Sequence, residues 1–572
     1  MNIRIHPVPG PRTLRRWHRP IGLVLCLLVC LPQVHAAARP SQAAIASAHP
    51  LATQAGLDIL GQGGNAFDAA VAVGATLAVV EPAGSGLGGG GLWLLRRGAD
   101  GKEILLDGRE RAPLAAARDM YLDKAGQPIP GLSIDGALAA AIPGMPAALV
   151  HLAEHYGHLP LATSLAPAIR HAEAGFALGE RHLRLLGPRA EALRRHPAAA
   201  AIFLPGGAVP RSGDTLVQRD LADSLRKLAR QGKAGFYGGT TAAALVEGVR
   251  AAGGIWTLDD LAGYRVVERP PVHGDYQGIR ITTAAPPSAG GVGLVEMLNM
   301  LSAYDLNHAP AITRKHLIVE AMRRAYHDRE TYLGDPDAVA MPILRLLSPN
   351  YAAGLSSTIR PDRALPSAAL SDTARPQPVG DNTTHYSILD REGNAVAATL
   401  SINYGFGSGF VAPGTGVLLN DEMDDFSIKP GSPNIYGLVG GEANAIAPGK
   451  RMLSSMTPTF LDDGDRLGLL GTPGGSRIVS MVLLAALDFA QGHGPASWVA
   501  VPRFHHQYLP DVVEYESGGL TEAEQNGLRQ LGHSLKAVDR RYGDMQAVLW
   551  DRRADRVEAA SDPRGEGAAR LR

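Results

Sequence analysis

The chain has 572 residues, of which 45% are hydrophobic and 19% are charged, proportions that are ordinary for a globular protein with a sizeable core. Its 55 basic side chains balance its 55 acidic ones, so the formal net charge is zero. Composition therefore gives no indication of a nucleic acid or an anionic membrane as partner.

The N-terminus has the pattern of an export signal. Four arginines between residues 12 and 19 precede the apolar run "IGLVLCLLVCL", which is too short to span a bilayer stably, and "QVHAAARP" then supplies small residues. We predict a signal peptide at residues 1–36, with cleavage after Ala36 or Ala38; an uncleaved membrane anchor is the alternative. The mature protein is expected to be periplasmic or secreted, with no membrane association after cleavage.

Both cysteines, Cys26 and Cys30, lie inside this predicted signal. The mature chain is therefore expected to have no disulfide, no thiol nucleophile and no cysteine-ligated metal. Any nucleophile must be an oxygen or a nitrogen atom.

The first two thirds of the mature chain are predicted to be mainly helical. Residues 43–80 are alanine-rich and helical in pattern, ending at Pro82. The glycine-rich "GSGLGGGG" then leads into strands at "LWLLRR" and "EILLDGRE". Residues 140–260 are mostly helical, and "TRKHLIVEAMRRAYHDRETYL" has the spacing of an amphipathic helix. Residues 361–382 lack periodicity and are predicted to be an exposed, mobile connection.

The pattern changes after residue 382. "THYSILD", the turn "REGN" and "AVAATLSIN" form a hairpin with period-two alternation. Further strands are predicted at "TPTFL" and "LGLLGTP", and a helix at "SRIVSMVLLAALDFAQG" begins directly after a Pro-Gly-Gly turn. This order predicts an α+β fold in which layers of helix pack on antiparallel sheet.

Three motifs are better explained by structure than by ligand binding. Residues 84–89 match G-x-G-x-x-G, but a helix precedes and a strand follows them, the reverse of the order in a dinucleotide site, so a loop allowing close backbone packing is preferred. His151 and His155 match the H-x-x-E-H pattern of zinc peptidases, with Glu154 as a base, but no third ligand is evident. "RFHHQYLPD" is likewise interpreted as structural, and no metal site is predicted.

Thr383, in "DNTTHYSILD", is a candidate nucleophile. A threonine hydroxyl needs an adjacent base, and the residue's own α-amino group can serve if the chain is cut immediately before it. A free α-amine has a pKa of about 8, near working pH, so it can accept the hydroxyl proton. Taken alone, a doubled threonine at the start of a strand is more simply a pair of β-forming residues.

The surrounding motifs change this balance. "TTHYSILDREGNAVAATLSINYGFGSG", "GVLLNDEMDDFS", "MLSSMTPT" and "GTPGGSRI", with "VEPAGSGLGGGG" and "LDGRERAP" upstream, resemble the γ-glutamyltransferase (glutathione hydrolase) family in order and spacing. The resemblance covers nearly the whole chain after the signal. It implies an N-terminal nucleophile hydrolase with a four-layer αββα sandwich, made as a proenzyme that cuts itself in two, and it implies no cofactor.

The resemblance also implies the reacting groups. Thr383 corresponds to the nucleophile, freed as a new N-terminus when its Oγ attacks the Asn382 carbonyl, and Thr384 to the second threonine of the motif, close to that amine. Ser401 stands where the family usually has a threonine whose hydroxyl hydrogen-bonds the nucleophile. Serine lacks the stiffening methyl group, so slower processing is expected.

Two further segments correspond to parts of the family's site. Gly474 and Gly475 match the oxyanion hole, where successive glycine amides at a helix start can face developing negative charge. Residues 429–441 resemble a lid loop present in some members, with Tyr436 as the residue that would cover the pocket.

A γ-glutamyl group presents an α-carboxylate and an α-ammonium at the end remote from the scissile amide. Arg109 matches the arginine that pairs with the carboxylate, a geometry suited to a guanidinium, and Arg111 is the weaker candidate. Without the resemblance, "NDEMDDF" would be an acidic loop or a calcium-like site. The other positions implied for this head group are Ser454 and Ser455 for the carboxylate, and Asp425 with Asn403 and Glu422 for the ammonium.

The predicted protein is a heterodimer of a large subunit, residues 37–382, and a small subunit, residues 383–572. Glutathione and related γ-glutamyl compounds are the expected donors, and water, amino acids or dipeptides the acceptors. One alternative is a cephalosporin-acylase-type amidase of the same superfamily, which would not need the full set of head-group residues. Another is an unprocessed, inactive exported binding protein of the same fold; a zinc peptidase is a more distant third.

Overall fold

The computed structural model describes residues 39–370 and 382–572. The predicted signal peptide and residues 371–381 of the predicted connection lie outside these ranges. Within them, no helix combines the length and the apolarity that a membrane crossing requires.

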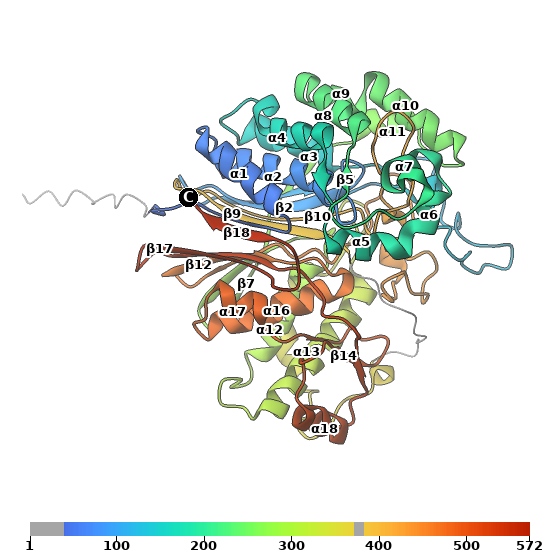
Figure 1. The fold of residues 1–572 in the computed structure, drawn as a ribbon. Coiled ribbons are helices and arrows are strands. Elements are labelled where there is room, and N and C mark those ends of the chain that lie inside the picture. The colour runs from blue at the N-terminus through green and yellow to red at the C-terminus, as the bar shows by residue number, and fades with distance from the viewer. Residues whose placement is uncertain (1–38, 371–381) are drawn as a thin grey trace, which may run out of the picture. The chain divides into compact units, whose positions relative to one another are not determined.

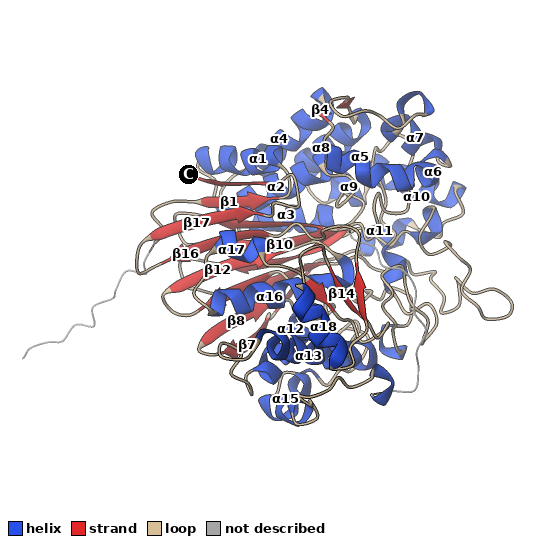
Figure 2. Ribbon diagram, turned by 60° about the horizontal axis from the view of Figure 1, so that its bottom comes forward, coloured by secondary structure: helices blue, strands red, loops and turns tan. Residues whose placement is uncertain are grey.

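Two antiparallel sheets lie face to face at the centre of the fold (Figures 1 and 2). The first sheet has the order β18 (Ala568–Leu571), β1 (Ala44–Ser47), β9 (Thr384–Leu389), β10 (Ala395–Ser401), β2 (Gly90–Arg96), β3 (Glu103–Gly108), β6 (Val267–Arg269). The second has the order β17 (Arg556–Ser561), β16 (Gln546–Asp551), β12 (Arg466–Gly471), β11 (Thr459–Asp462), β8 (Ile279–Thr283), β7 (Val272–Tyr276).

Helices cover the outer face of each sheet, as Figure 1 shows. The seven-stranded sheet is covered by α1 (Pro50–Gly61), α2 (Ala66–Val80) and α3 (Met145–His155). The six-stranded sheet is covered by α12 (Gly290–Leu301), α16 (Ile478–Ala490) and α17 (Pro495–Ala500), and α13 (Ala311–Tyr332) packs on α12. A separate apolar cluster fills the space between the sheets. The predicted four-layer αββα sandwich is therefore confirmed.

The hairpin predicted after residue 382 forms β9 and β10, paired with Thr384 opposite Leu400 and Leu389 opposite Ala395. Its alternation sorts side chains between layers, because successive residues of a strand point to opposite faces. Tyr386 and Ile388 join the core under the helices, whereas Ala395 and Ala397 join the core between the sheets. The period-two pattern of the hairpin therefore matches the register in which β9 and β10 pair.

The helical prediction for residues 140–260 is confirmed, apart from the short strands β4 (Phe176–Ala177) and β5 (Thr215–Leu216). The helices after α3 are α4 (Leu161–Ala174), α5 (Glu180–Leu186), α6 (Ala190–Arg194), α7 (Pro197–Phe203), α8 (Arg219–Gln231), α9 (Ala234–Tyr237), α10 (Gly239–Ala251) and α11 (Leu258–Gly263).

Three expectations are corrected. Residues 43–80 are not one helical stretch, because β1 precedes α1 and Asn65 caps the start of α2 with its side chain. Helix α13 is not amphipathic over its middle, where even Glu320 and Arg323 are buried. The connection is not wholly exposed, because Ser367 is buried and accepts a hydrogen bond from Arg323.

Candidate active site

Thr383 lies immediately before β9 and is buried, with 4% of its surface exposed. Its Oγ1 donates a hydrogen bond to the carbonyl oxygen of Asn382. Its φ is 152°, on the side of the backbone map that residues with a side chain seldom adopt. The hydroxyl therefore contacts the peptide unit at which the sequence predicts cleavage, and the backbone there is strained.

Ser401 ends β10 and lines the same cavity as Thr383. Its Oγ accepts a hydrogen bond of 2.8 Å from the backbone N–H of Asn403. The glycine loop before β2 packs against this segment: a Cβ atom on Gly89 would lie 2.1 Å from the Ser401 carbonyl oxygen, and one on Gly88 would lie 2.0 Å from that of Leu418. The G-x-G-x-x-G motif is thus a close-packing loop, as predicted.

Arg109 follows β3 and is almost fully buried at 1% exposure. Its guanidinium donates to Glu422 and to Asp425, each at 2.5 Å, and more weakly to Glu110 at 3.3 Å. Asn434 adds a 3.2 Å hydrogen bond to the other oxygen of Asp425. The groups expected to bind a carboxylate and an ammonium therefore pair with each other in this structure.

Three carboxylates around one guanidinium cannot all be neutralised by it. Burial raises the pKa of Glu110 to about 7, although the charge of Arg109 opposes this. Burial also raises the pKa of Glu422 well above its ordinary value, again against the attraction of Arg109. One oxygen of each of these two carboxyls is buried without a hydrogen-bond partner in the described residues. The cluster therefore favours holding at least one proton near neutral pH.

Gly474 directly precedes η7 (Gly475–Arg477), Gly475 is its first residue, and η7 continues into α16. Their φ angles are 141° and 55°, both in the region that favours glycine. Within the described residues, neither backbone N–H donates a hydrogen bond. Gly475 lines the cavity of Thr383, so its amide is available to an oxygen atom bound there.

Tyr436 also lines this cavity. Its hydroxyl donates to the carbonyl oxygen of Asn403 at 2.7 Å, and its ring lies against Gly475, where an added Cβ atom would be 2.5 Å away. The remaining space is about 20 Å³, enough for about one water molecule. A γ-glutamyl group would therefore have to displace the ring or separate Arg109 from Asp425.

Most of the site residues expected from the sequence come together. One cavity is lined by nine of them, joined by the apolar side chains of Leu438, Met456 and Ile478, which the sequence did not single out. Glu422 lies behind Arg109, and Gly474 borders a different cavity. The nine are Arg109, Thr383, Ser401, Asn403, Asp425, Tyr436, Ser454, Ser455 and Gly475.

Two predicted neighbours turn away from the cavity. The Thr384 hydroxyl donates to Glu81 at 2.5 Å, and Glu81 is paired with Arg181 at 3.3 Å. Arg111, the weaker candidate for binding the α-carboxylate, donates to the carbonyl oxygen of Gly449. Glu110, the third carboxylate on Arg109, was missed. Its position directly after Arg109 in "GRERAP" was the available signal.

The histidine motifs form no convergent ligand set. His151 bonds Glu268 at 2.9 Å and stacks on His155, whose Nδ1 is bonded to the backbone oxygen of His151. In "RFHHQYLPD", His505 bonds Ser480, and His506 bonds Asp511. All of these contacts are those of structural side chains.

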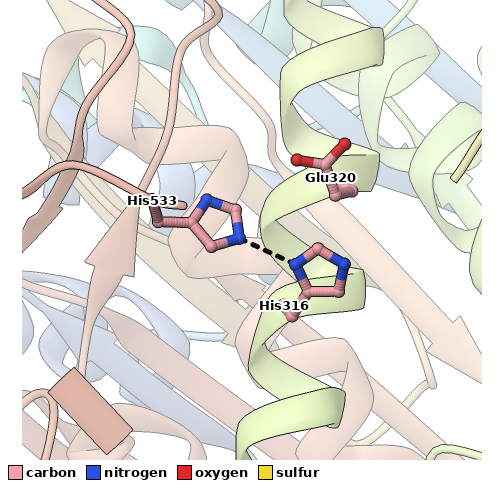
Figure 3. Close-up of side chains that lie close together, drawn as sticks. All are labelled: His316, Glu320 and His533. Atoms are coloured by element: carbon pink, nitrogen blue, oxygen red, sulfur yellow. Dashed lines mark hydrogen bonds between the residues drawn. The ribbon is translucent and has the colours of Figure 1, made fainter. Parts of the chain in front are cut away.

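A different histidine pair has metal-ligand spacing. Ligand atoms of His316, Glu320 and His533 lie within 4.8 Å of one another (Figure 3). The Nε2 atom of His316 lies 2.7 Å from the Arg360 carbonyl oxygen, and its Nδ1 atom shares a 2.7 Å hydrogen bond with Nε2 of His533. Burial lowers the pKa of His533 to about 3, and two arginine side chains hold the Glu320 carboxylate. Each of the three side chains therefore has a hydrogen-bond or ion-pair partner among the described residues.

Known proteins resemble this chain over most of its length. The family model described as gamma-glutamyltranspeptidase matches residues 52–571. The chain belongs to this family. It is 43% identical over 522 residues to a glutathione hydrolase proenzyme of Pseudomonas sp. (strain A14), with 90% of each chain covered. It is 41% identical to the glutathione hydrolase proenzyme of Escherichia coli (strain K12), covering 92% of this chain and 91% of the relative.

Among solved structures, the cephalosporin acylase from Bacillus halodurans matches with a TM-score of 0.82 and 29% identity, covering 93% of this chain and 96% of that one. The resemblance inferred from the motifs is confirmed, and the gamma-glutamyltranspeptidase family to which the chain belongs is a family of enzymes. Acylases share the fold, so the substrate has to be argued from the residues in the cavity.

Proposed function

We propose that the protein is an exported, self-processing γ-glutamyl hydrolase and transferase that acts through a γ-glutamyl ester on Thr383. The observation that carries this proposal is the cavity shared by Thr383 and Arg109, which is lined by a buried threonine, an arginine and the Asp425 carboxylate paired with that arginine. A zwitterionic head group matches that pair of charges, and its amide would then reach the hydroxyl.

Processing begins with the contact between Thr383 and Asn382. The Oγ1 atom attacks the Asn382 carbonyl carbon, the C–N bond breaks, and the proton lost by the hydroxyl is matched by one gained at the nitrogen. Water then hydrolyses the resulting ester, which leaves an Asn382 carboxylate and a free α-amine on Thr383. The strained φ of Thr383 supports this step, because cleavage releases the backbone from that conformation.

Catalysis uses the new amine as the base. It accepts the Thr383 hydroxyl proton as Oγ1 attacks the γ-carbonyl carbon, and it returns a proton to the departing amine. The N–H groups of Gly474 and Gly475 stabilise the negative oxygen of the tetrahedral intermediate, and Ser401 orients the nucleophile. Water or an amine acceptor then attacks the ester carbon and restores the hydroxyl.

Recognition of the head group exchanges one set of ion pairs for another. The donor's α-carboxylate takes the place of Asp425 on Arg109, with Ser454 and Ser455 as further donors. Its ammonium takes the place of Arg109 on Asp425, with Glu422 and Asn403 adding acceptors. In both states Arg109 and Asp425 each keep a partner of opposite charge, which is the condition for holding these two charges in a buried site.

The cut is expected to leave a large subunit of residues 37–382 and a small subunit of residues 383–572, held together as a heterodimer. Sheet pairing supports this assembly, because β9 and β10 lie between β1 and β2 in one sheet. The expected donors are glutathione and related γ-glutamyl compounds, with amino acids or dipeptides as acceptors, in the periplasm or outside the cell.

The test is a denaturing gel followed by an activity assay. Wild-type protein should separate into two pieces, with the new N-terminal sequence starting at Thr383, and should hydrolyse a γ-glutamyl anilide. The Thr383→Ala variant should give one band and no measurable activity. A wild type that stays a single chain after prolonged incubation would contradict the mechanism and favour an inactive binding protein.

The structural similarity to a cephalosporin acylase suggests a second substrate class, acyl amides that lack the α-ammonium group. A glutaryl anilide has the same chain as a γ-glutamyl anilide but lacks the α-ammonium that Asp425 would bind. We expect the γ-glutamyl compound to be preferred by at least about 100-fold, of the size of one lost charge-assisted interaction in a buried site. Equal rates on the two anilides would support the acylase function instead.

A further inference from the structure

A second and larger cavity, of about 400 Å³, borders the candidate site at Gly474. Gly475, the next residue, lines the cavity of Thr383, so one turn of the chain separates the two spaces. The second cavity is also bordered by α5 and by the segment between β15 (Leu535–Ala537) and β16. This space is large enough for a dipeptide, whereas the cavity of Thr383 is nearly filled.

The lining of this cavity is basic. Five arginine side chains border it, and no aspartate or glutamate is among the residues of the described chain that line it. Two of these five arginines form ion pairs with carboxylates that do not line the cavity. Arg181 pairs with Glu81 and Asp544 at 3.3 and 3.5 Å, and Arg564 pairs with Glu516 at 2.5 Å.

Arg184 and Arg541 differ from that pair. Both side chains are exposed, and neither forms an ion pair or a hydrogen bond with the part of the chain that the structure describes. Arg184 lies on α5, which is part of the segment before residue 382, and Arg541 lies after it. Two guanidinium groups from segments on either side of residue 382 therefore border one cavity, and neither has an ion-pair partner among the described residues.

The reaction defines what this space has to accept. The amine that leaves in the first half of the reaction and the amine that attacks in the second half are bonded to the same carbon, so they occupy the same place. In glutathione and in amino-acid or dipeptide acceptors, that amine belongs to a molecule that ends in a free carboxylate. The head-group pocket lies on the Arg109 side, so this molecule must extend elsewhere.

Resting on the proposed function, we propose that the cavity beside Gly474 is the subsite for the leaving group and the acceptor, and that Arg184 and Arg541 bind its terminal carboxylate. A dipeptide spans about 7 Å from amine to carboxylate when extended. Because both side chains are exposed to solvent, the interaction is screened by salt and contributes selectivity rather than tight binding.

The experiment compares two acceptors in the double variant Arg184→Ala/Arg541→Ala. With a γ-glutamyl anilide as donor, kcat/KM is measured for glycylglycine and for its C-terminal amide, and the ratio of the two reports recognition of the carboxylate. The matched control is Arg553→Ala, another exposed arginine whose nearest carboxylate is 4.0 Å away. The ratio is independent of any change in donor hydrolysis.

We expect the ratio to fall about tenfold in the double variant, as for loss of one charge-assisted hydrogen bond, and to stay at the wild-type value in the control. Arg541→Glu should invert the preference towards the amide. A ratio unchanged in both of these variants would overturn the subsite while leaving the proposed function intact.

A direct binding measurement separates the two proposals. Ligand-observed NMR with glycylglycine should show saturation transfer in the wild type, weaker transfer in the double variant, and loss of transfer at high salt. If the wild type fails to hydrolyse the anilide, the proposed function is wrong and this measurement alone decides on the subsite. Equal transfer in wild type and double variant would overturn it.

Discussion

Thr383 and Arg109 line one cavity, but their surroundings differ. Around Thr383 the groups are hydroxyls and backbone amides, held at the ends of β9 and β10 and in the turn before α16. Around Arg109 the groups are charged side chains on segments outside the sheets, and they are paired with one another. Backbone hydrogen bonds position the end of the cavity with the proposed nucleophile, Thr383 (the nucleophile end). Ion pairs position the end with Arg109, where the head group is proposed to bind (the head-group end).

Because of this difference, substitutions at the two ends of the cavity should affect different properties of the protein. A substitution at the nucleophile end alters chemistry without altering buried charge. A substitution at the head-group end alters binding, pH dependence and stability together, because a buried charge that loses its partner is costly. The four predictions that follow test this division, in order of decreasing effect.

Arg109→Lys should lower kcat/KM for a γ-glutamyl anilide by about 300-fold, since the compact ammonium cannot replace a guanidinium that contacts two groups at once. Chain cleavage should remain complete on a denaturing gel, because the nucleophile end is untouched. Arg111→Lys is the control and should retain activity. Loss of cleavage in Arg109→Lys would show that the two ends are not independent.

Gly475→Ala should lower kcat by about 100-fold, of the size seen when one oxyanion donor is lost. The new Cβ atom would lie 2.5 Å from the Tyr436 ring, and φ is 55° there. Gly239→Ala is matched in φ, at 57°, but has open space and lies outside the site, so it should leave kcat nearly unchanged. Combining Gly475→Ala with Tyr436→Ala should recover part of the loss; no recovery would place the defect in the backbone alone.

Glu110→Gln should become more stable relative to the parent as pH rises from about 4.5 to 7.5, by about 2 kcal/mol. Burial raises the pKa of Glu110 to about 7 in the fold, so its contribution is full below pH 4.5 and is lost as pH rises through 7. Glutamine stays neutral and avoids that loss. The free energy of unfolding should be measured in the single-chain Thr383→Ala background.

The exposed Glu247→Gln is the control for this pH series. It should leave the pH dependence of stability unchanged. A parallel pair of curves for Glu110→Gln and its parent would mean that the pKa of Glu110 is the same in the folded and unfolded states.

Ser401→Thr should speed chain cleavage by about threefold. The added methyl group restricts χ1 and holds the hydroxyl in fewer orientations. The time course of the two bands on a denaturing gel reports the rate, with Ser401→Ala as the variant that should be slower than wild type. A rate that is unchanged or lower in Ser401→Thr would show that the methyl group does not fit here.

Much of the fold followed from local pattern. The β9–β10 hairpin was evident from its alternation and turn residues, and α16 from its apolar run after glycines. The strand β1 was not, because its four residues, "AIAS", have no pattern that separates strand from helix. Its pairing with β9 and β18 decided the outcome, and these partners are more than 300 residues away.

The site divides in the same way. The sequence by itself determined the nucleophile candidate, the glycines that a tight turn needs and the identity of the charged residues. Only the tertiary structure decided that Arg109 meets Asp425, 316 positions later, with Glu110 as a third carboxylate, and that Arg184 and Arg541 face one cavity. Local patterns report propensity, whereas charge pairing depends on contacts between distant segments that form only when the layers pack.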